Sequence, residues 1–294
     1  MDRVELTHYK VEKKIKLSDY KTVASLEASD KELKKGLESI REELGEFQDT
    51  LYAHNKYSVL ICIQGMDTAG KDSLIREVFK DFNARGVVVH SFKVPTELEL
   101  GHDYIWRHYI ALPAKGKFGV FNRTHYENVL VTRVHPEYIL GERIPGVHQV
   151  SDIDQKFWDK RFEQINNFES HIAENGTIIF KFFLHLSKEE QRQRLLRRLA
   201  LKRKNWKFSP GDLKERALWN EYQKCYEEAI NETSKPNAPW YIIPADNKKA
   251  ARVIVASVLL EELKKYQDIE EPELADKIKA NLEVYKNQLE NEKE

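Results

Sequence analysis

The sequence predicts an α/β fold in which a parallel sheet of five strands is flanked by helices. From residue 58 onward, short runs dense in β-branched and aromatic residues alternate with helical patterns. This alternation is typical of a parallel sheet with helices on both faces. The first run continues directly into Gly65–Asp72, which reads G-M-D-T-A-G-K-D. Glycine and lysine at this spacing, after a strand and before a helix, are typical of a phosphate-binding loop.

Length and composition narrow the class of protein. The chain has 294 residues, with 48 Lys and Arg against 48 Asp and Glu, so any anion site must come from local clustering of cations. The two cysteines, Cys62 and Cys225, lack ligand spacing, and we expect neither a disulfide framework nor a zinc site. The N-terminus is polar and no apolar run approaches about 18 residues. We therefore expect a soluble cytoplasmic protein with no membrane partner.

Residues 1–57 are expected to form an N-terminal helical arm. Ser29 and Glu32 have the spacing of a capping box. One apolar stripe then follows at alternating steps of four and three: Leu33, Leu37, Ile40, Leu44, Phe47 and Leu51. This stripe is expected to dock either on the core or on another subunit.

Residues 58–267 form the predicted core, and their strands set the place of the ligand. The expected strands are Ser58–Gln64, Val87–Val94, Phe118–Asn122, Thr177–His185 and Trp240–Pro244. Ligands of parallel sheets bind beyond the carboxyl ends of the strands. The phosphate loop and the segments after Asn122 and Pro244 should therefore converge.

Residues 268–294 are acidic, with nine acids against four lysines. A helical stripe still runs through them, formed by Leu274, Ile278, Leu282, Tyr285 and Leu289. We expect a docked C-terminal helix here rather than a disordered acidic tail.

The phosphate loop departs from the usual pattern in two positions. Asp72 follows Lys71 where Ser or Thr normally supplies a magnesium ligand, and Asp67 adds a second carboxylate inside the loop. Carboxylates repel an anionic ligand unless a cation lies between them, so the loop indicates magnesium-dependent phosphoryl transfer. A simple β–α turn with a solvated lysine is the alternative. The expected phosphate contacts are Gly65, Thr68, Ala69, Gly70, Lys71, Asp72 and Ser73.

The segment after the third strand supplies further candidates. Asn122 ends that strand, where P-loop folds usually carry a magnesium-facing acid. Arg123 can match the oxygens of a transferred phosphoryl group, although a surface arginine is the alternative. Glu127 either caps the next helix or contacts the nucleotide. Asn122 and, further along the chain, Glu137 are also candidate nucleotide ligands. Arg133, on the same helix as Glu127, is a candidate phosphate ligand.

Residues 191–207 hold eight cations and no acid. Repulsion among charges this close is unfavourable without an anionic partner. We expect a helical lid over phosphates at about residues 188–215, anchored by Leu195, Leu196 and Leu199. A nucleic-acid patch fits the charge too, but Trp206 alone offers no interleaved stacking platform, so no nucleic acid is expected. The predicted phosphate ligands, of which the first three share a helical face, are Arg194, Arg198, Lys202, Arg203 and Lys207.

Several long motifs resemble the second family of polyphosphate kinases. These are GMDTAGKD, FNRTHYENVLVTRV, KFFLHLSKEEQRQRL and PNAPWYIIPADNKKAAR, and the resemblance runs from about Lys31 to Lys265. The FNRTHYE form is similar to the subclass that phosphorylates both AMP and ADP. The resemblance implies a P-loop kinase core related to thymidylate kinase, with a mobile lid.

The resemblance also implies substrates and roles. Inorganic polyphosphate would be the donor and an adenine nucleotide the acceptor, with guanine left open. Mg2+ would be required, with Mn2+ as a substitute, in a dimer or tetramer. Asp67 would hold the metal, Lys71 would bind phosphate and Arg123 would bridge donor and acceptor. Asn122 stands where other subclasses have aspartate, which leaves the second metal ligand open.

Two other functions compete with this interpretation. One is an ATP-dependent nucleoside monophosphate kinase, which would need a less extended cationic track. The other is a non-catalytic P-loop module that binds RNA through residues 192–207. The length of the shared motifs favours the polyphosphate-dependent enzyme over both.

Overall fold

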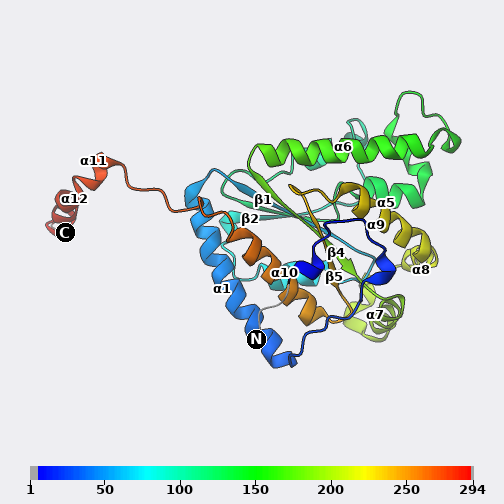
Figure 1. The fold of residues 1–294 in the computed structure, drawn as a ribbon, viewed down its shortest axis with the longest axis horizontal. Helices are drawn as coiled ribbons and strands as arrows, with labels where there is room; N and C mark the ends of the chain where they lie inside the picture. The colour runs from blue at the N-terminus through cyan, green and yellow to red at the C-terminus, as the bar shows by residue number, and fades with distance from the viewer. Residues whose placement is uncertain (1–5, 293–294) are drawn as a thin grey trace.

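A parallel sheet of five strands forms the centre of the molecule (Figure 1). The computed structural model describes residues 6–292, except for the side chains of residues 203, 204 and 207. The strand order is β2-β3-β1-β4-β5, and every neighbouring pair is parallel. This confirms the predicted sheet, although β2 ends at Ser91 instead of Val94. The strands are β1 Ser58–Gln64, β2 Val87–Ser91, β3 Phe118–Asn122, β4 Thr177–His185 and β5 Trp240–Pro244.

The central strand β1 is buried along its whole length. Its side chains alternate between the two faces of the sheet, with Val59, Ile61 and Ile63 in one apolar cluster and Leu60 and Cys62 in another. Ile63 pairs with Asn122 of β3, so these two strands end side by side. The loop after β1 therefore begins beside the residues that follow β3.

Helices cover both faces of the sheet. One face packs against α1 (Asp30–His54), α2 (Lys71–Val78) and α10 (Lys248–Leu263). The other packs against α5 (Glu127–Val134), α6 (Gln155–Glu174) and α9 (Trp219–Thr233). Between these elements lie α3 Glu97–Leu100, α4 Trp106–Tyr109, α7 Lys188–Ala200 and α8 Pro210–Ala217, with 3-10 turns η3 Ala84–Gly86, η4 Pro136–Glu142, η5 Val150–Asp152 and η6 Lys202–Lys207.

The stripe on α1 docks on the core of its own chain. Leu33, Leu37, Leu44 and Leu51 are buried in the cluster that also contains α10. The predicted capping box is present, since Ser29 N donates to Glu32 Oε2 at 2.7 Å and Glu32 N donates to Ser29 Oγ at 3.3 Å. Two docking surfaces were expected for the stripe, the core and another subunit. The structure therefore shows the stripe docked on the core.

The segment before α1 is not the helical arm expected for residues 1–57. In the described part it forms two short 3-10 turns, η1 (Leu6–Tyr9) and η2 (Leu17–Asp19), while residues 1–5 lie outside the description. Val11 N donates to Trp240 O at 2.9 Å, and the Val11 side chain is buried. The segment thus covers the edge of β5, which would otherwise expose unpaired backbone groups.

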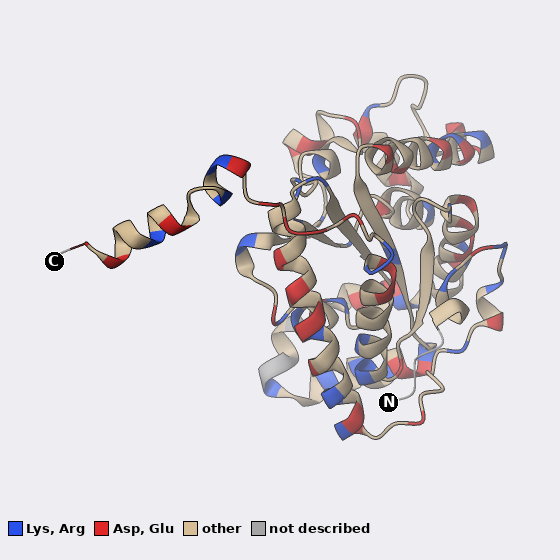
Figure 2. Ribbon diagram, turned by 60° about the vertical axis from the view of Figure 1, so that its left-hand side comes forward, with Lys and Arg blue, Asp and Glu red and all other residues tan. Residues whose placement is uncertain are grey.

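The C-terminal residues form α11 (Asp276–Lys279) and α12 (Leu282–Glu290), which extend away from the body (Figures 1 and 2). No residue of either helix is buried, so the expected docking of this segment is wrong. Other helices already cover both faces of the sheet. The apolar stripe of the C-terminal segment therefore has no place in the core. In the described range, 6–292, no helix combines the length and apolar character needed to cross a membrane.

Candidate active site

Glycine shapes the loop between β1 and α2. A Cβ added to Gly65 would lie 3.0 Å from Leu184 O, and Gly70 has a φ of 111° directly before α2. Thr68 also has a positive φ, 66°, a backbone conformation that is uncommon outside glycine. The loop therefore turns sharply and presents its N–H groups at the start of an eight-residue helix, where anions bind.

Lys71 bends back across this loop. Its Nζ donates to Gly65 O at 2.6 Å and is 3.4 Å from Met66 O. Burial and, after it, the neighbouring Arg123 lower the pKa of Lys71 to about 8, against the opposing effect of Asp67. An ammonium whose hydrogen bonds go to carbonyl oxygens gains strongly from an anion, so a bound phosphate would favour the charged form of Lys71.

Arg123 joins the loop to α5. It has a φ of 60°, and this left-handed turn at the end of β3 aims its side chain at the loop. Nη2 donates to Asp67 Oδ1 at 2.9 Å and Nη1 donates to Glu127 Oε2 at 3.1 Å. Glu127 is the main cause of the raised pKa of Arg123, with Asp67 adding to it while burial opposes both. The guanidinium therefore stays cationic, and with 41% of its side chain exposed it can be reached by a substrate.

Oxygen atoms for a metal ion are available beside the loop. Asn122 Nδ2 donates to Asp72 Oδ1 at 2.8 Å, which orients the amide. Asn122 Oδ1 and Thr68 Oγ1 are both buried, and neither has a hydrogen-bond partner among the described residues. Hard oxygen donors of this kind suit Mg2+. Within the described residues, no group of three or more His, Cys, Asp or Glu could hold a metal by itself. A cation would therefore need oxygens from the substrate as well, as is usual for Mg2+.

Arg194 has a different task from the one expected. Nη1 donates to Thr68 O and Ala69 O, both at 2.9 Å, and Nη2 donates to Ala245 O at 2.7 Å and Asp246 O at 2.9 Å. Nε donates to the carboxylate of Glu190 at 2.7 Å. Since a guanidinium has five N–H donors, none is left for a phosphate in this conformation. Arg194 instead clamps the phosphate loop to the segment after β5, and it joins the loops that were expected to converge.

The rest of the predicted lid also differs from its expectation. Leu195 is buried, but Leu196 and Leu199 are each 48% exposed and anchor nothing within the described chain. Helix α7 ends at Ala200, so Lys202 lies in η6 and not on the face of Arg198. Arg198 Nη1 donates to Asp212 Oδ2 of α8 at 3.2 Å. The side chains of Arg203 and Lys207 lie outside the described part of the structure.

Two further candidates are held away from the loop. Arg133, toward the far end of α5, lies 2.6 Å from Glu228 Oε1 and over the ring of Trp158 at 5.4 Å. The Glu137 carboxylate lies 3.5 Å from His135 Nδ1, with 55% of its side chain exposed. The structure thus brings Glu127, but neither Arg133 nor Glu137, to Arg123.

Three residues that touch the site were missed at the level of sequence. Gln191 Nε2 donates to Asp67 O at 3.0 Å, and Arg216 Nη1 donates to Gln191 Oε1 at 2.7 Å. Tyr226 of α9 lies in one buried cluster with Met66 of the phosphate loop, and burial raises its pKa. At helical spacing from Trp219 and Tyr222, Tyr226 has the pattern of an ordinary core residue, so only its contact reveals its place.

A cavity of about 300 Å³ opens beside α6, between the end of η4 and the segment before α4. Arg161 lies over the ring of Tyr104 at 3.9 Å, and its Nη1 donates to Asn128 O at 3.4 Å, next to Glu127 in the chain. None of the three expected nucleotide ligands lines this cavity. Its lining is His102, Asp103, Tyr104, Glu142, Ile144, Phe157, Lys160, Arg161 and Gln164.

Comparison with known proteins adds independent findings. A family model described as Polyphosphate kinase 2 matches residues 27–272. An ADP-polyphosphate phosphotransferase of Rhodopseudomonas palustris is 48% identical over 220 residues, 75% of this chain and 75% of that protein. An AMP/ADP-polyphosphate phosphotransferase of Meiothermus ruber is 46% identical over 224 residues, 76% of this chain and 78% of that protein.

A solved structure agrees with the fold. The crystal structure of polyphosphate kinase 2 from Arthrobacter aurescens TC1 has a TM-score of 0.84 and 34% sequence identity, and the match covers 95% of each chain.

Proposed function

This chain belongs to the polyphosphate kinase 2 family, and from that premise we propose that it transfers the terminal phosphoryl group of inorganic polyphosphate to AMP and ADP. The products are ADP and ATP. The bonds broken and formed are both phosphoanhydrides of similar energy, so the reaction also runs in reverse. The observation that carries the proposal is Arg123, a partly exposed cation 2.9 Å from the carboxylate of the phosphate loop.

The proposed mechanism relies on alignment and charge. The attacking oxygen of a nucleotide phosphate is already ionised near neutrality, so no general base is required. Lys71 and the N–H groups of the loop hold the phosphate chain, while Arg123 faces the group that is transferred. Fixed cations in a partly dry site stabilise the charge of the transition state without reorganising.

A divalent cation completes the proposed site. Nucleotide kinases generally require one, and we propose Mg2+, with Mn2+ as a substitute. Asp67 and Oδ1 of Asn122 would hold it, because both offer oxygen atoms beside the loop. When bound, the cation would neutralise phosphate charge that the carboxylates of Asp67 and Asp72 would otherwise repel.

One assay tests the function. The purified protein is incubated with Mg2+, AMP and long-chain polyphosphate in the absence of ATP, and nucleotides are separated by chromatography. Formation of ADP and then ATP is expected. Turnover that requires ATP as donor would instead indicate a nucleoside monophosphate kinase. Absence of any turnover, together with RNA binding that weakens with salt, would indicate the RNA-binding module.

We further propose that Arg198 of α7 lines the path of polyphosphate. Arg198→Ala is expected to raise KM for polyphosphate about fivefold, because one partly exposed charge contact contributes on the order of 1 kcal/mol. The increase should grow at low salt and fade at high salt, while KM for AMP stays constant. Initial rates at several salt concentrations measure this.

The matched control is Arg85→Ala. Arg85 is exposed and precedes β2, so it lies at the amino ends of the parallel strands, whereas the phosphate loop lies at their carboxyl ends. This variant should leave both KM values unchanged. An Arg198 variant that alters only the KM for AMP would contradict the proposed path.

Three expectations from the sequence stay predictions. These are a homo-oligomer, either dimer or tetramer, a cytoplasmic location, and the absence of a nucleic-acid partner. Exposed apolar side chains on α12, among them Leu282 and Leu289, support an interface between copies, since they pack on nothing in the described chain. The molar mass in solution tests the first of the three.

A further inference from the structure

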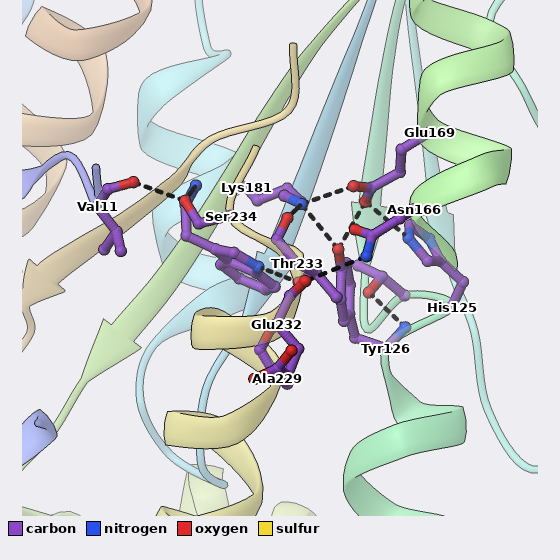
Figure 3. A network of polar contacts seen from close by, with 12 residues as sticks. Val11, His125, Tyr126, Asn166, Glu169, Lys181, Ala229, Glu232, Thr233 and Ser234 are labelled. Atoms are coloured by element: carbon purple, nitrogen blue, oxygen red, sulfur yellow. Dashed lines mark hydrogen bonds and ion pairs between the residues drawn. The ribbon is translucent and has the colours of Figure 1, made fainter. Parts of the chain in front are cut away.

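A buried network of charged and hydroxyl groups joins β4, α6 and the turn before α5 (Figure 3). Lys181 of β4 donates through Nζ to Glu169 Oε2 at 2.6 Å, Tyr126 OH at 2.8 Å and Thr233 O at 2.7 Å. An ammonium has three donors, so all are satisfied. The side chains of Lys181 and Glu169 are 0% and 1% exposed. The pair is therefore a fully buried ion pair that no substrate can touch.

The network holds the turn that follows Arg123. Tyr126 OH donates to Glu169 Oε1 at 2.7 Å, and His125 Nε2 lies 3.1 Å from the same oxygen. Thr124 is fixed from the other side, because its Oγ1 accepts from Tyr126 N and from Gln64 Nε2, both at 3.1 Å. Each of the three residues between Arg123 and α5 thus has a buried side-chain contact.

Arg123 needs such support because its backbone is strained. A φ of 60° places it in the left-handed region, which is unfavourable for a residue with a Cβ. Such a conformation persists only where the surroundings enforce it. If this turn relaxed, the guanidinium of Arg123 would move away from the carboxylate of Asp67, because the turn sets the direction of the Arg123 side chain.

The second branch of the network reaches α9. Thr233 ends that helix, and its Oγ1 accepts from Trp240 Nε1 at 2.9 Å. The same helix carries Tyr226, which lies in one buried cluster with Met66 of the phosphate loop. Lys181 therefore ties together the corner at Arg123 and the helix that contacts the phosphate loop.

Stability alone does not account for a charged pair here. Burial lowers the pKa of Lys181, and Glu169 opposes this. Burial also acts to raise the pKa of Glu169, but Lys181 and His125 outweigh it, so the pKa is lowered and the carboxylate stays ionised. Well-packed apolar side chains in place of a buried ion pair are often equally stable or more so. What they do not supply is hydrogen bonds of fixed direction to Tyr126 and His125.

We propose that Lys181 and Glu169 are positioning residues for phosphoryl transfer, whose ion pair fixes the corner at residues 124–126 and thereby the orientation of Arg123. The inference deepens the proposed function and rests on it. Neither residue touches a substrate. Their loss should slow the chemical step and leave substrate affinity nearly unchanged.

The test removes both charges together, because a single substitution would leave one buried charge unpaired and could unfold the protein. In the double variant Lys181→Met, Glu169→Leu, kcat is expected to fall about tenfold or more, since small misplacements of a catalytic group have large effects on rate. KM for AMP and for polyphosphate should change less than about twofold, and the variant should remain folded by thermal melting. A folded double variant with normal kcat would overturn the proposal.

A double-mutant cycle separates positioning from general damage. With Arg123→Ala already present, removal of the pair should lower kcat less than about twofold, because the pair acts through Arg123. The same tenfold loss in both backgrounds would refute that route. Arg41→Met is the control, since Arg41 is 7% exposed and pairs with Asp81 on the opposite face of the sheet. It should lower the melting temperature and leave kcat unchanged.

A crystal structure of the double variant gives a readout that does not depend on activity. The guanidinium of Arg123 is expected to have left Asp67 Oδ1, which it contacts at 2.9 Å in the parent protein. An unchanged contact would overturn the inference whether or not the enzyme uses polyphosphate. Absence of turnover by the parent protein would refute the proposed function instead, so the two failures are distinguishable.

Discussion

Replacing Arg123 with alanine is expected to lower kcat for phosphoryl transfer from polyphosphate to AMP at least about a hundredfold, the usual loss when a charge-stabilising donor is removed. In the folded protein its guanidinium lies between the carboxylates of Asp67 and Glu127. Its loss would leave these two carboxylates beside the phosphates, with no cation between them. Steady-state rates of ADP formation, with circular dichroism as the check on folding, measure the effect.

Arg143→Ala is the matched control for this substitution. Arg143 is also an arginine with a left-handed backbone, φ 55°, but its side chain is 71% exposed and it follows η4. It should lose no rate. Arg123→Lys should recover only part of the activity, because an ammonium cannot offer two parallel N–H donors as a guanidinium does. Rates near those of the parent in Arg123→Ala would remove this residue from the mechanism.

Lys71→Ala is expected to cause a loss of similar size. Lys71 Nζ lies 2.6 Å from Gly65 O at the base of the phosphate loop, where a phosphate would draw it away. Removal of this cation leaves the loop with backbone donors alone. Rates are measured at saturating polyphosphate, so that weaker binding of polyphosphate is not mistaken for a lower kcat. Lys80→Ala, beyond the end of α2 and exposed, should be unaffected.

The pKa of Lys71 adds a pH dependence to the same prediction. Burial lowers this pKa to about 8, so the side chain is a cation below that pH and becomes neutral above it. Since kcat/KM reports the free enzyme, kcat/KM for polyphosphate should fall as the pH rises through about 8. In Lys71→Arg, the residual activity should lack this alkaline decline, because arginine stays protonated. An identical decline in that variant would assign the titration to another group.

Local signals were sufficient for the framework of the protein. Four of the five strands begin and end at the predicted residues, because each is a short run of β-branched and aromatic residues bounded by polar ones. The capping box at Ser29 and the turn at Gly65 were likewise predicted, since both depend on residues within a few positions. The family also followed from contiguous motifs, and the family match confirms it.

Charge was a poorer guide to partners. Arg194 and Arg133 were expected to bind phosphate, yet one is engaged by backbone carbonyls and the other by Glu228. An arginine in a cationic run looks the same in the sequence whether its partner is a phosphate or the protein itself. The backbone carbonyls that accept from Arg194 belong to residues 51 to 126 positions away, and no spacing rule reaches that far.

What the sequence determined by itself is therefore the sheet, the phosphate loop, the family and the presence of Asp67, Lys71 and Arg123 at adjoining strand ends. Only the tertiary structure decided which cations are available to a ligand, that the C-terminal helices stand apart from the core, and that Lys181 meets Glu169 in the core. The reason is physical. Elements arise from interactions between near neighbours in the chain, whereas the partner of a charged side chain depends on how distant elements pack.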